Sequence, residues 1–182
     1  IYTLSLHDAL PIYPVLDAVR PFEESAGRKI PIFVAGGVFD GKDMARFMEL
    51  GAAGVQIGTR FIATEECDAH ENFKQMMVKA APEDVRIIAS PVGMPARALY
   101  SPLIQRLEKG ERFSALRCSN CLTGCKKGDN IPYCISRALI EAVQGNVEDG
   151  LFFCGENVHR IDKIMTVEAL MSEIVSEWRE NS

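Results

Sequence analysis

The sequence has no long apolar run and no strong excess of charge of either sign. Its 182 residues include 20 basic and 25 acidic side chains, a net charge of −5 at pH 7. This mild charge gives no argument for a nucleic acid or an anionic membrane surface as a partner. No apolar stretch approaches the roughly 20 residues that span a bilayer, and no secretory signal pattern is present. We therefore expect no membrane partner and a cytoplasmic location.

Internal repeats and low-complexity tracts are also missing. Hydrophobic residues make up 47% of the chain and charged residues 25%, which is an ordinary composition for one domain with its own core. Six cysteines are present. Without an export signal, we expect them to be reduced thiols or metal ligands rather than disulfides.

The first twelve residues, IYTLSLHDALPI, do not match the pattern of the rest. They lack an initiator Met and resemble the translated read-through of a sequencing adapter. We therefore predict a non-native tail over residues 1–12, with a natural strand and turn as the alternative. On the first interpretation, the native chain is the C-terminal part of a longer protein. At the other end, Thr166 is a predicted N-cap for an amphipathic helix over residues 166–182.

Apolar stretches of helix length and strand length alternate from Tyr13 to Gly93. The strand-length runs are continuous, which is typical of strands buried on both faces of a parallel sheet. The alternation predicts right-handed βαβ units and an α/β fold. The expected helices cover residues 13–25, 40–50 and 68–80, and the expected strands cover residues 30–35, 53–57 and 85–89.

Glycine follows each of the first two expected strands, as Gly36-Gly37 and as Gly58-Thr59. Parallel strands deliver such loops to one edge of the sheet, where α/β folds bind ligands. Glycine lets the backbone approach an anion, and a following helix start adds N–H donors and partial positive charge. The Thr59 hydroxyl and the Arg60 guanidinium are further expected donors. The pair predicts a phosphate site of the kind that (β/α)8 barrels form, with ligand-free tight turns as the alternative.

Four cysteines are spaced as C-x2-C-x3-C-x8-C, at Cys118, Cys121, Cys125 and Cys134. Cysteines this close together are candidate ligands for zinc or for an iron–sulfur cluster. The alternative is that they bind no metal and that Cys134 is a buried thiol on the apolar side of a helix. Cys67 and Cys154 have no partner at ligand spacing and are expected to be structural.

The segment IPIFVAGGVFDGKDMARFMELGAAGVQIGTRFIATEEC closely resembles the C-terminal part of the nitronate monooxygenase (2-nitropropane dioxygenase) family. The later segments SPVGMPARAL and IPYCISRALIEAVQGNVEDGLFFCGENVHRIDKI continue the resemblance. The family overlaps in sequence with the flavin-containing enoyl-acyl-carrier-protein reductases. The resemblance implies an FMN-dependent TIM (β/α)8 barrel, whose C-terminal part covers residues 13–98. A smaller helical, cysteine-containing region over residues 99–182 follows it.

The resemblance also implies roles for particular residues. Ala35, Gly36 and Gly37 match the first FMN-phosphate loop, and Gly58 and Thr59 match the second. Arg60 and Phe61 belong to the same motif without an assigned role. Gly155 and Asn157 match a turn that lies near the flavin in the family.

The catalytic residue is unknown, because the family's catalytic histidine lies upstream of the matching segment. His159 is a candidate because it follows the turn at Gly155 and Asn157. The alternative is a side chain that packs beside Arg160 and Asp162.

The implied activity is that of a flavin-dependent oxidoreductase, which oxidises alkyl nitronates with O2 and uses FMN. We expect the chain to be incomplete and inactive alone. One alternative is an FMN-dependent enoyl-acyl-carrier-protein reductase that uses NAD(P)H and an enoyl thioester. Others are a phosphate-binding barrel enzyme without redox chemistry and a metal-knuckle interaction module. The oligomeric state stays open, with a homodimer as one candidate.

Overall fold

The computed structural model describes residues 12–113, 118–122, 125 and 131–182. Contacts divide the chain into two compact units. The first unit runs to Arg60 and also includes Met165–Ser182, and the second unit is Phe61–Ile164. The expected end of the barrel part, after residue 98, falls inside the second unit.

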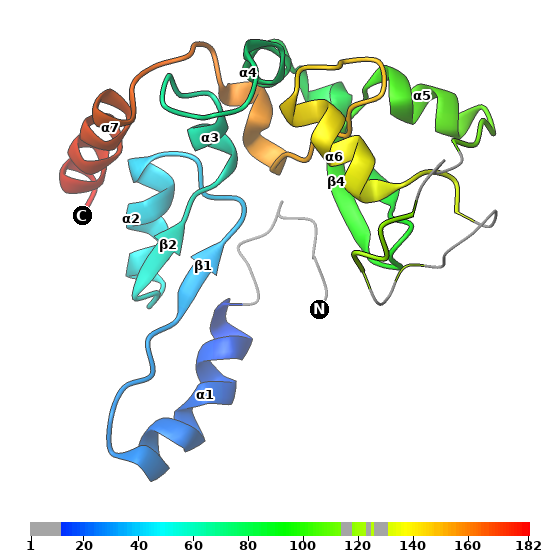
Figure 1. Ribbon diagram of the computed structural model, residues 1–182. Coiled ribbons are helices and arrows are strands. Elements are labelled where there is room, and N and C mark those ends of the chain that lie inside the picture. The colour runs from blue at the N-terminus through cyan, green and yellow to red at the C-terminus, as the bar shows by residue number, and fades with distance from the viewer. Residues whose placement is uncertain (1–11, 114–117, 123–124, 126–130) are drawn as a thin grey trace. The chain divides into compact units, whose positions relative to one another are not determined.

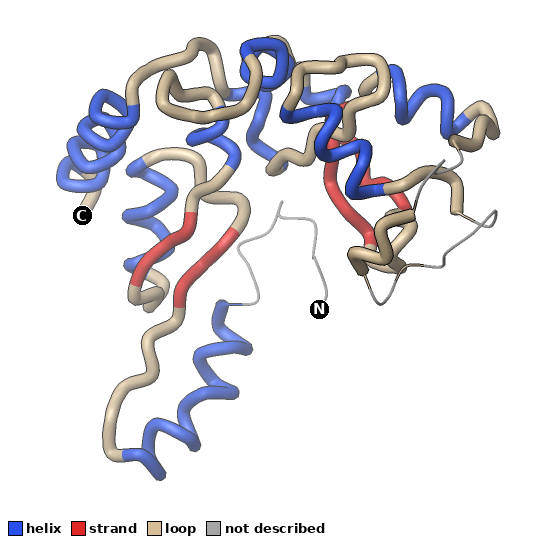
Figure 2. Tube along the Cα trace, in the orientation of Figure 1, coloured by secondary structure: helices blue, strands red, loops and turns tan. Residues whose placement is uncertain are grey.

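The first unit contains a parallel pair of short strands (Figures 1 and 2). Strands β1 and β2 pair in register, with Val34 opposite Val55. The helices and strands predicted in this part of the chain are present, and both strands are shorter than predicted. The elements are α1 (Ile12–Ala26), β1 (Phe33–Ala35), α2 (Gly41–Glu49), β2 (Gly54–Gln56), the start of α3 (Thr59–Ile62), and α7 (Val167–Glu180).

Capping confirms the predicted ends of two helices in this unit. The side chain of Asp40 accepts a hydrogen bond from the backbone N–H of Asp43 and begins α2, and that of Thr166 caps α7 in the same way. Gly51 follows α2 with a φ of 104°, a conformation that favours glycine at a helix end. The core of the unit consists of Ile12, Val34, Val38, Phe47 and Ala52.

The predicted burial of β1 on both faces is wrong. Val34 is only 8% exposed, whereas its neighbour Phe33 is 65% exposed. The reason is that the described sheet has two strands, and its core residues lie on the face that carries Val34. The Phe33 ring instead covers Gly54 on β2, where an added Cβ would lie 2.7 Å from the ring.

Helix α7 packs closely beside α2, as Figure 1 shows. The backbone N–H of Gly41 donates a 2.9 Å hydrogen bond to the Glu177 carboxylate. A Cβ at Gly41 would overlap the backbone of Ile174 and Trp178. Glycine at the start of α2 therefore allows the two helices to approach at backbone distance.

The second unit is built around a strand hairpin and several helices (Figure 2). Its core consists of Ala98, Leu103, Ile104, Tyr133, Ile135, Ala138 and Leu151. Among the helices described, none is long and apolar enough to cross a bilayer. The elements are α4 (Glu71–Val78), η1 (Pro82–Asp84), β3 (Val85–Ala89), β4 (Pro95–Leu99), α5 (Pro102–Glu108), α6 (Ile135–Val143) and η2 (Glu156–Arg160).

The third predicted strand has the predicted bounds but the wrong partner. Strand β3 pairs antiparallel with β4, with Val85 opposite Leu99 and Ala89 opposite Pro95. Only the short segment 90–94 joins them, and it turns at Gly93 with a φ of 90°. A parallel crossover needs a dozen or more residues, so this connection permits only a hairpin.

Candidate phosphate-binding site

The two predicted glycine loops leave the parallel pair at the same edge. Ala35 and Gln56 form the last paired position of β1 and β2, and Gly36 and Gly58 follow them directly or after one residue. Ala35, Gly36 and Gly58 are exposed, and the neighbouring loop residues Gly37 and Thr59 are half-buried. The structure therefore brings five predicted site residues together on an accessible edge.

The backbone conformation requires glycine in the first loop but not in the second. Gly36 and Gly37 have φ values of 84° and 74°, which residues with a Cβ adopt only with strain. Gly58 has no such conformation, and an added Cβ there would meet nothing within 4 Å. The space beside Gly58 is therefore open, and it fits the approach of a ligand phosphate to the backbone.

The start of α2 does not supply the N–H donors that the sequence predicted. The backbone N–H of Asp43 donates to Asp40 Oδ1 at 2.8 Å, and that of Phe39 donates to Asp43 Oδ2 at 2.9 Å. The N–H of Gly41 donates to Glu177 Oε2. Carboxylates that cap a helix start lower its attraction for another anion. These pairings weaken the argument for a phosphate at this helix end, and its role stays a prediction.

Arg60 does not serve as the predicted phosphate donor either. Its Nη1 donates to the carbonyl oxygen of Phe39 at 3.2 Å, and its Nη2 is paired with the carboxylate of Glu173. The guanidinium carbon also lies 4.5 Å from the centre of the Phe39 ring. The Arg60 side chain is only 10% exposed. Through these contacts it joins the segment after β1 to the segment after β2 and to α7.

Two carboxylates of α7 position residues beside the site, and the sequence analysis missed them. Glu173 and Glu177 pair with the two loop regions through Arg60 and Gly41. They are four residues apart and therefore lie on one helix face. Two acidic residues on the same helix side as the buried Ile174 were the sequence signal that could have indicated these contacts.

The other predicted flavin contacts lie in the second unit. Gly155 is the residue before η2, and Asn157 is half-buried within η2. Glu156 forms a 2.7 Å ion pair with Arg97 of β4, which anchors this turn to the hairpin. The roles of Gly155 and Asn157 stay predictions.

The remaining predicted residues are also in the second unit. His159 is exposed, and its Nδ1 lies 3.2 Å from the Glu156 carbonyl oxygen. Phe61 is half-buried, and its carbonyl oxygen accepts a 2.8 Å hydrogen bond from the Thr64 hydroxyl. Burial raises the pKa of the Cys154 thiol to about 12, which suits a structural thiol. The four closely spaced cysteines line one pocket: Cys118, Cys121, Cys125 and Cys134.

A comparison with protein families matches residues 8–177 to the family described as nitronate monooxygenase. The match covers nearly the whole chain, both glycine loops and the turn at Gly155. It supports the resemblance found in the sequence.

Curated proteins similar to this chain include probable nitronate monooxygenases and a carboxyl-CoA dehydrogenase. The chain is 32% identical over 152 residues to a probable nitronate monooxygenase of Staphylococcus saprophyticus, a match that covers 83% of this chain and 39% of the relative. It is 39% identical over 98 residues to a Mycobacterium tuberculosis protein, named (3aS,4S,5R,7aS)-5-hydroxy-7a-methyl-1-oxo-octahydro-1H-indene-4-carboxyl-CoA dehydrogenase. That match covers 54% of this chain and 26% of the relative.

Among solved structures, FabK from Thermotoga maritima is similar, with a TM-score of 0.66 and 32% identity. The similarity covers 86% of this chain and 46% of that one. The α/β elements of this chain have the fold of part of a TIM barrel. The chain spans half or less of the length of each of these relatives.

Proposed function

Because the chain belongs to the nitronate monooxygenase family, we propose that it carries the phosphate-binding part of a flavin-dependent oxidoreductase. The proposed cofactor is FMN, and the proposed reaction is the oxidation of an alkyl nitronate by O2. One observation carries the proposal. Two glycine loops lie on one accessible edge of a parallel strand pair, and Arg60 holds their two segments together.

The residues proposed to hold the FMN phosphate are Ala35, Gly36, Gly37, Gly58 and Thr59. The left-handed turn at Gly36 and Gly37 exposes backbone, and the open space beside Gly58 leaves room for phosphate oxygens. Arg60 keeps the two segments in place without contributing a charge of its own to the anion. Bound flavin supplies the redox chemistry, whereas these residues supply binding and position. Gly155 and Asn157 are proposed as further flavin contacts, and His159 as a weaker catalytic candidate.

A titration of the chain with FMN and with riboflavin tests the phosphate site. Riboflavin lacks the phosphate, so we expect FMN to bind at least about tenfold more tightly, a difference of about 1.4 kcal/mol. Flavin fluorescence measures both affinities. Equal affinities for the two flavins would refute the assignment of these loops to phosphate.

The variant Gly58→Val places a side chain in the open space and should remove the preference for FMN. Its control is Ala53→Val, which adds the same side chain at the exposed amino end of β2. We expect the control to keep the preference. A loss in both variants would mean that the strand, rather than the loop, was disturbed.

A second activity is favoured by the names of two relatives, the carboxyl-CoA dehydrogenase and FabK. The alternative is a flavin-dependent enzyme that acts on an acyl thioester, with NAD(P)H as reductant. An assay of the gene product that contains this chain distinguishes the two. Oxygen uptake with a nitronate supports the first reaction, and NADH oxidation that depends on an enoyl thioester supports the second. We expect the 182-residue chain alone to catalyse neither, and a cytoplasmic location and a homodimer stay predictions.

A further inference from the structure

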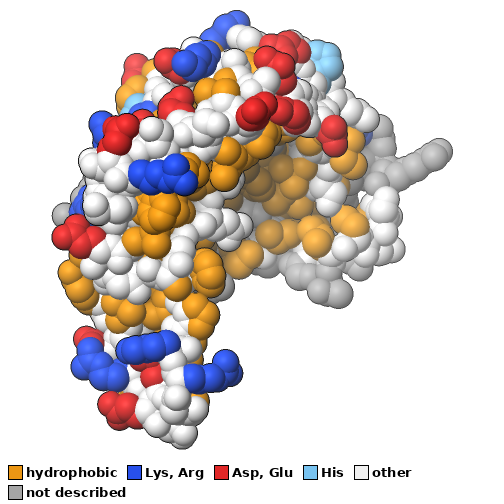
Figure 3. Space-filling view, turned by 90° about the vertical axis from the view of Figure 1, so that its left-hand side faces the viewer, with side chains coloured by type: hydrophobic (Ala, Val, Ile, Leu, Met, Phe, Trp, Pro, Cys, Tyr) orange, Lys and Arg blue, Asp and Glu red, His pale blue; other side chains and the backbone are white. Residues whose placement is uncertain are grey.

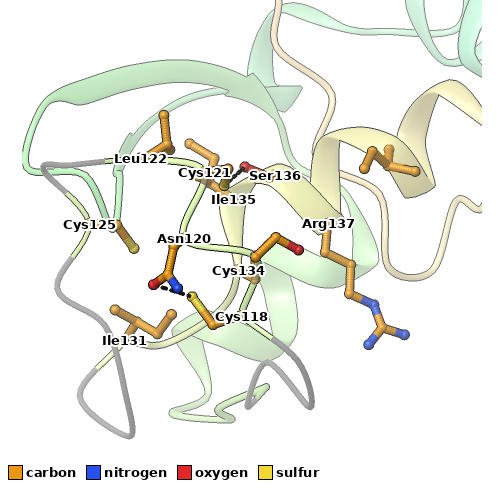
Figure 4. Close-up of a pocket in the computed structure, with 12 residues that line it drawn as sticks. Cys118, Asn120, Cys121, Leu122, Cys125, Ile131, Cys134, Ile135, Ser136 and Arg137 are labelled. Carbon is orange, nitrogen blue, oxygen red and sulfur yellow. Dashed lines mark hydrogen bonds between the residues drawn. The ribbon is translucent and has the colours of Figure 1, made fainter.

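Four cysteine side chains line a single pocket in the second unit, as Figure 4 shows. Cys118, Cys121 and Cys125 precede α6 in the chain, and Cys134 is the N-cap residue of that helix. The cavity has a volume of about 350 Å³. Half of its other lining side chains are apolar, namely Leu122, Ile131, Ile135 and Ile140. The proposed flavin chemistry uses none of these thiols.

The four thiols are free and accessible enough to bind a ligand. None is in a disulfide, and each is exposed or half-buried. The Cys121 sulfur lies 3.1 Å from the Ser136 hydroxyl, and the Cys118 sulfur lies 3.9 Å from Asn120 Oδ1. Sulfur forms only weak hydrogen bonds, so a metal centre can replace these two contacts at low cost in free energy.

The arrangement suits a cluster better than a single ion. Zinc holds four thiolates at about 2.3 Å, which draws all the sulfur atoms to one point. Across the described residues, no group of three or more His, Cys, Asp or Glu side chains is arranged to hold a metal ion, so the thiols must turn toward one another when a metal centre binds. They line one cavity of about 350 Å³. A [4Fe–4S] cluster fills such a space, because each of four cysteines binds a different corner.

The charges around the pocket favour an anionic group. No Asp or Glu is among its described lining residues. The positive end of α6 faces it through Cys134, Ile135 and Ser136, and the first turn of α6 carries no acidic residue. Arg137 also lines the pocket, although its Nε lies 3.4 Å from the carboxylate of Glu141.

We propose that Cys118, Cys121, Cys125 and Cys134 bind a [4Fe–4S] cluster in this pocket. Each thiol loses its proton to solvent and forms one Fe–S bond. Two Fe²⁺, two Fe³⁺ and four sulfide ions make a core of charge +2, and the four thiolates bring the bound centre to −2. Iron and inorganic sulfide are the only reactants that assembly requires, and no electron is gained or lost.

The test is a measurement of iron and acid-labile sulfide in the chain, purified without oxygen and reconstituted with iron salts and sulfide under reducing conditions. We expect about four iron and four sulfide per chain, and a Mössbauer signal typical of a [4Fe–4S] cluster. Both readouts are independent of bound flavin and of enzyme activity. One zinc per chain without sulfide, or no metal at all, would overturn the proposal.

Serine variants assign the ligands. Cys118→Ser, Cys121→Ser, Cys125→Ser and Cys134→Ser should each lose most of the iron. Cys67→Ser and Cys154→Ser are matched controls outside the pocket and should keep it. Circular dichroism separates loss of the cluster from loss of fold. Equal iron in the pocket variants and in the controls would show that the metal binds elsewhere.

Discussion

Arg60 joins three segments of the first unit through one guanidinium group. It reaches Phe39 after β1 and Glu173 on α7, while its own backbone follows β2. The sequence identified the residue and its motif, but not its partners. Those partners lie 21 and 113 residues away in the chain, so no local pattern names them.

The variant Arg60→Met should lower the free energy of unfolding by about 2 kcal/mol, because it removes hydrogen bonds to a carboxylate and to a backbone carbonyl. Urea denaturation measures the change. Arg20→Met is the control, since Arg20 pairs with Asp17 at 66% and 65% side-chain exposure. We expect the control to change stability by less than about 0.5 kcal/mol. Similar effects of the two variants would contradict the structural role of Arg60.

Burial gives Cys154 a pH-dependent effect on stability. Its pKa is raised from 9.0 to about 12 in the folded chain. The unfolded chain therefore loses this proton first, and the contribution is complete below pH 9 and declines as the pH rises toward 12. Each pH unit in that range costs about 1.4 kcal/mol.

Between pH 8 and pH 10, the wild-type chain should lose about 1 kcal/mol more stability than the Cys154→Ala variant. Urea denaturation at the two pH values gives the difference. Cys118→Ala is the control, because Cys118 is exposed, and it should keep the wild-type pH dependence. The same pH dependence in wild type and in Cys154→Ala would show that the thiol is not buried in solution.

At the scale of elements, local sequence patterns predicted where helices and strands occur better than they predicted which strands pair. The start of a helix at residue 40, the cap at Thr166 and the bounds of β3 are as the sequence indicated. The parallel pairing of β3 was wrong because the prediction used strand and helix alternation alone. The sequence analysis also missed the strand β4, which follows β3 after only the short segment 90–94 and therefore pairs with it as a hairpin.

The packing of α2 on α7 gives a prediction for one glycine. Gly41→Ala adds a Cβ that overlaps the backbone of α7, so it should lower the free energy of unfolding by about 2 kcal/mol or more. Thermal or urea denaturation measures the loss. Gly58→Ala is the same substitution where a Cβ meets nothing, and it should have little effect on stability. An unchanged Gly41→Ala variant would mean that the two helices are further apart.

At the scale of the whole chain, exposed apolar surface is the feature that predicts behaviour in solution. The first unit leaves large apolar side chains exposed, including Phe22 at 67% and Phe33 at 65%. Figure 3 shows hydrophobic side chains open on one face of the molecule. Among the described residues, β1 pairs with β2 alone, and exposed apolar groups on such a strand favour association with another chain.

We expect the 182-residue chain to self-associate as its concentration rises, as measured by sedimentation. Phe33→Ser should weaken the association by about tenfold or more, because burial of a phenylalanine contributes roughly 1.5–3 kcal/mol. Met171→Ser removes an apolar side chain that is 45% exposed on α7, rather than on the strand pair, and serves as the control. A monomeric wild-type chain at all concentrations would refute this prediction.

The sequence by itself determined α1, α2, α7 and the two glycine loops, because apolar periodicity and turn chemistry act over a few residues, and its resemblance to known sequences indicated the family. Only the tertiary structure decided that Arg60 and the start of α2 are already paired with carboxylates, and that β3 turns back into a hairpin. These outcomes depend on contacts between segments far apart in the chain. Their energies come from packing and hydrogen bonding in three dimensions, which a residue's neighbours in sequence do not reveal.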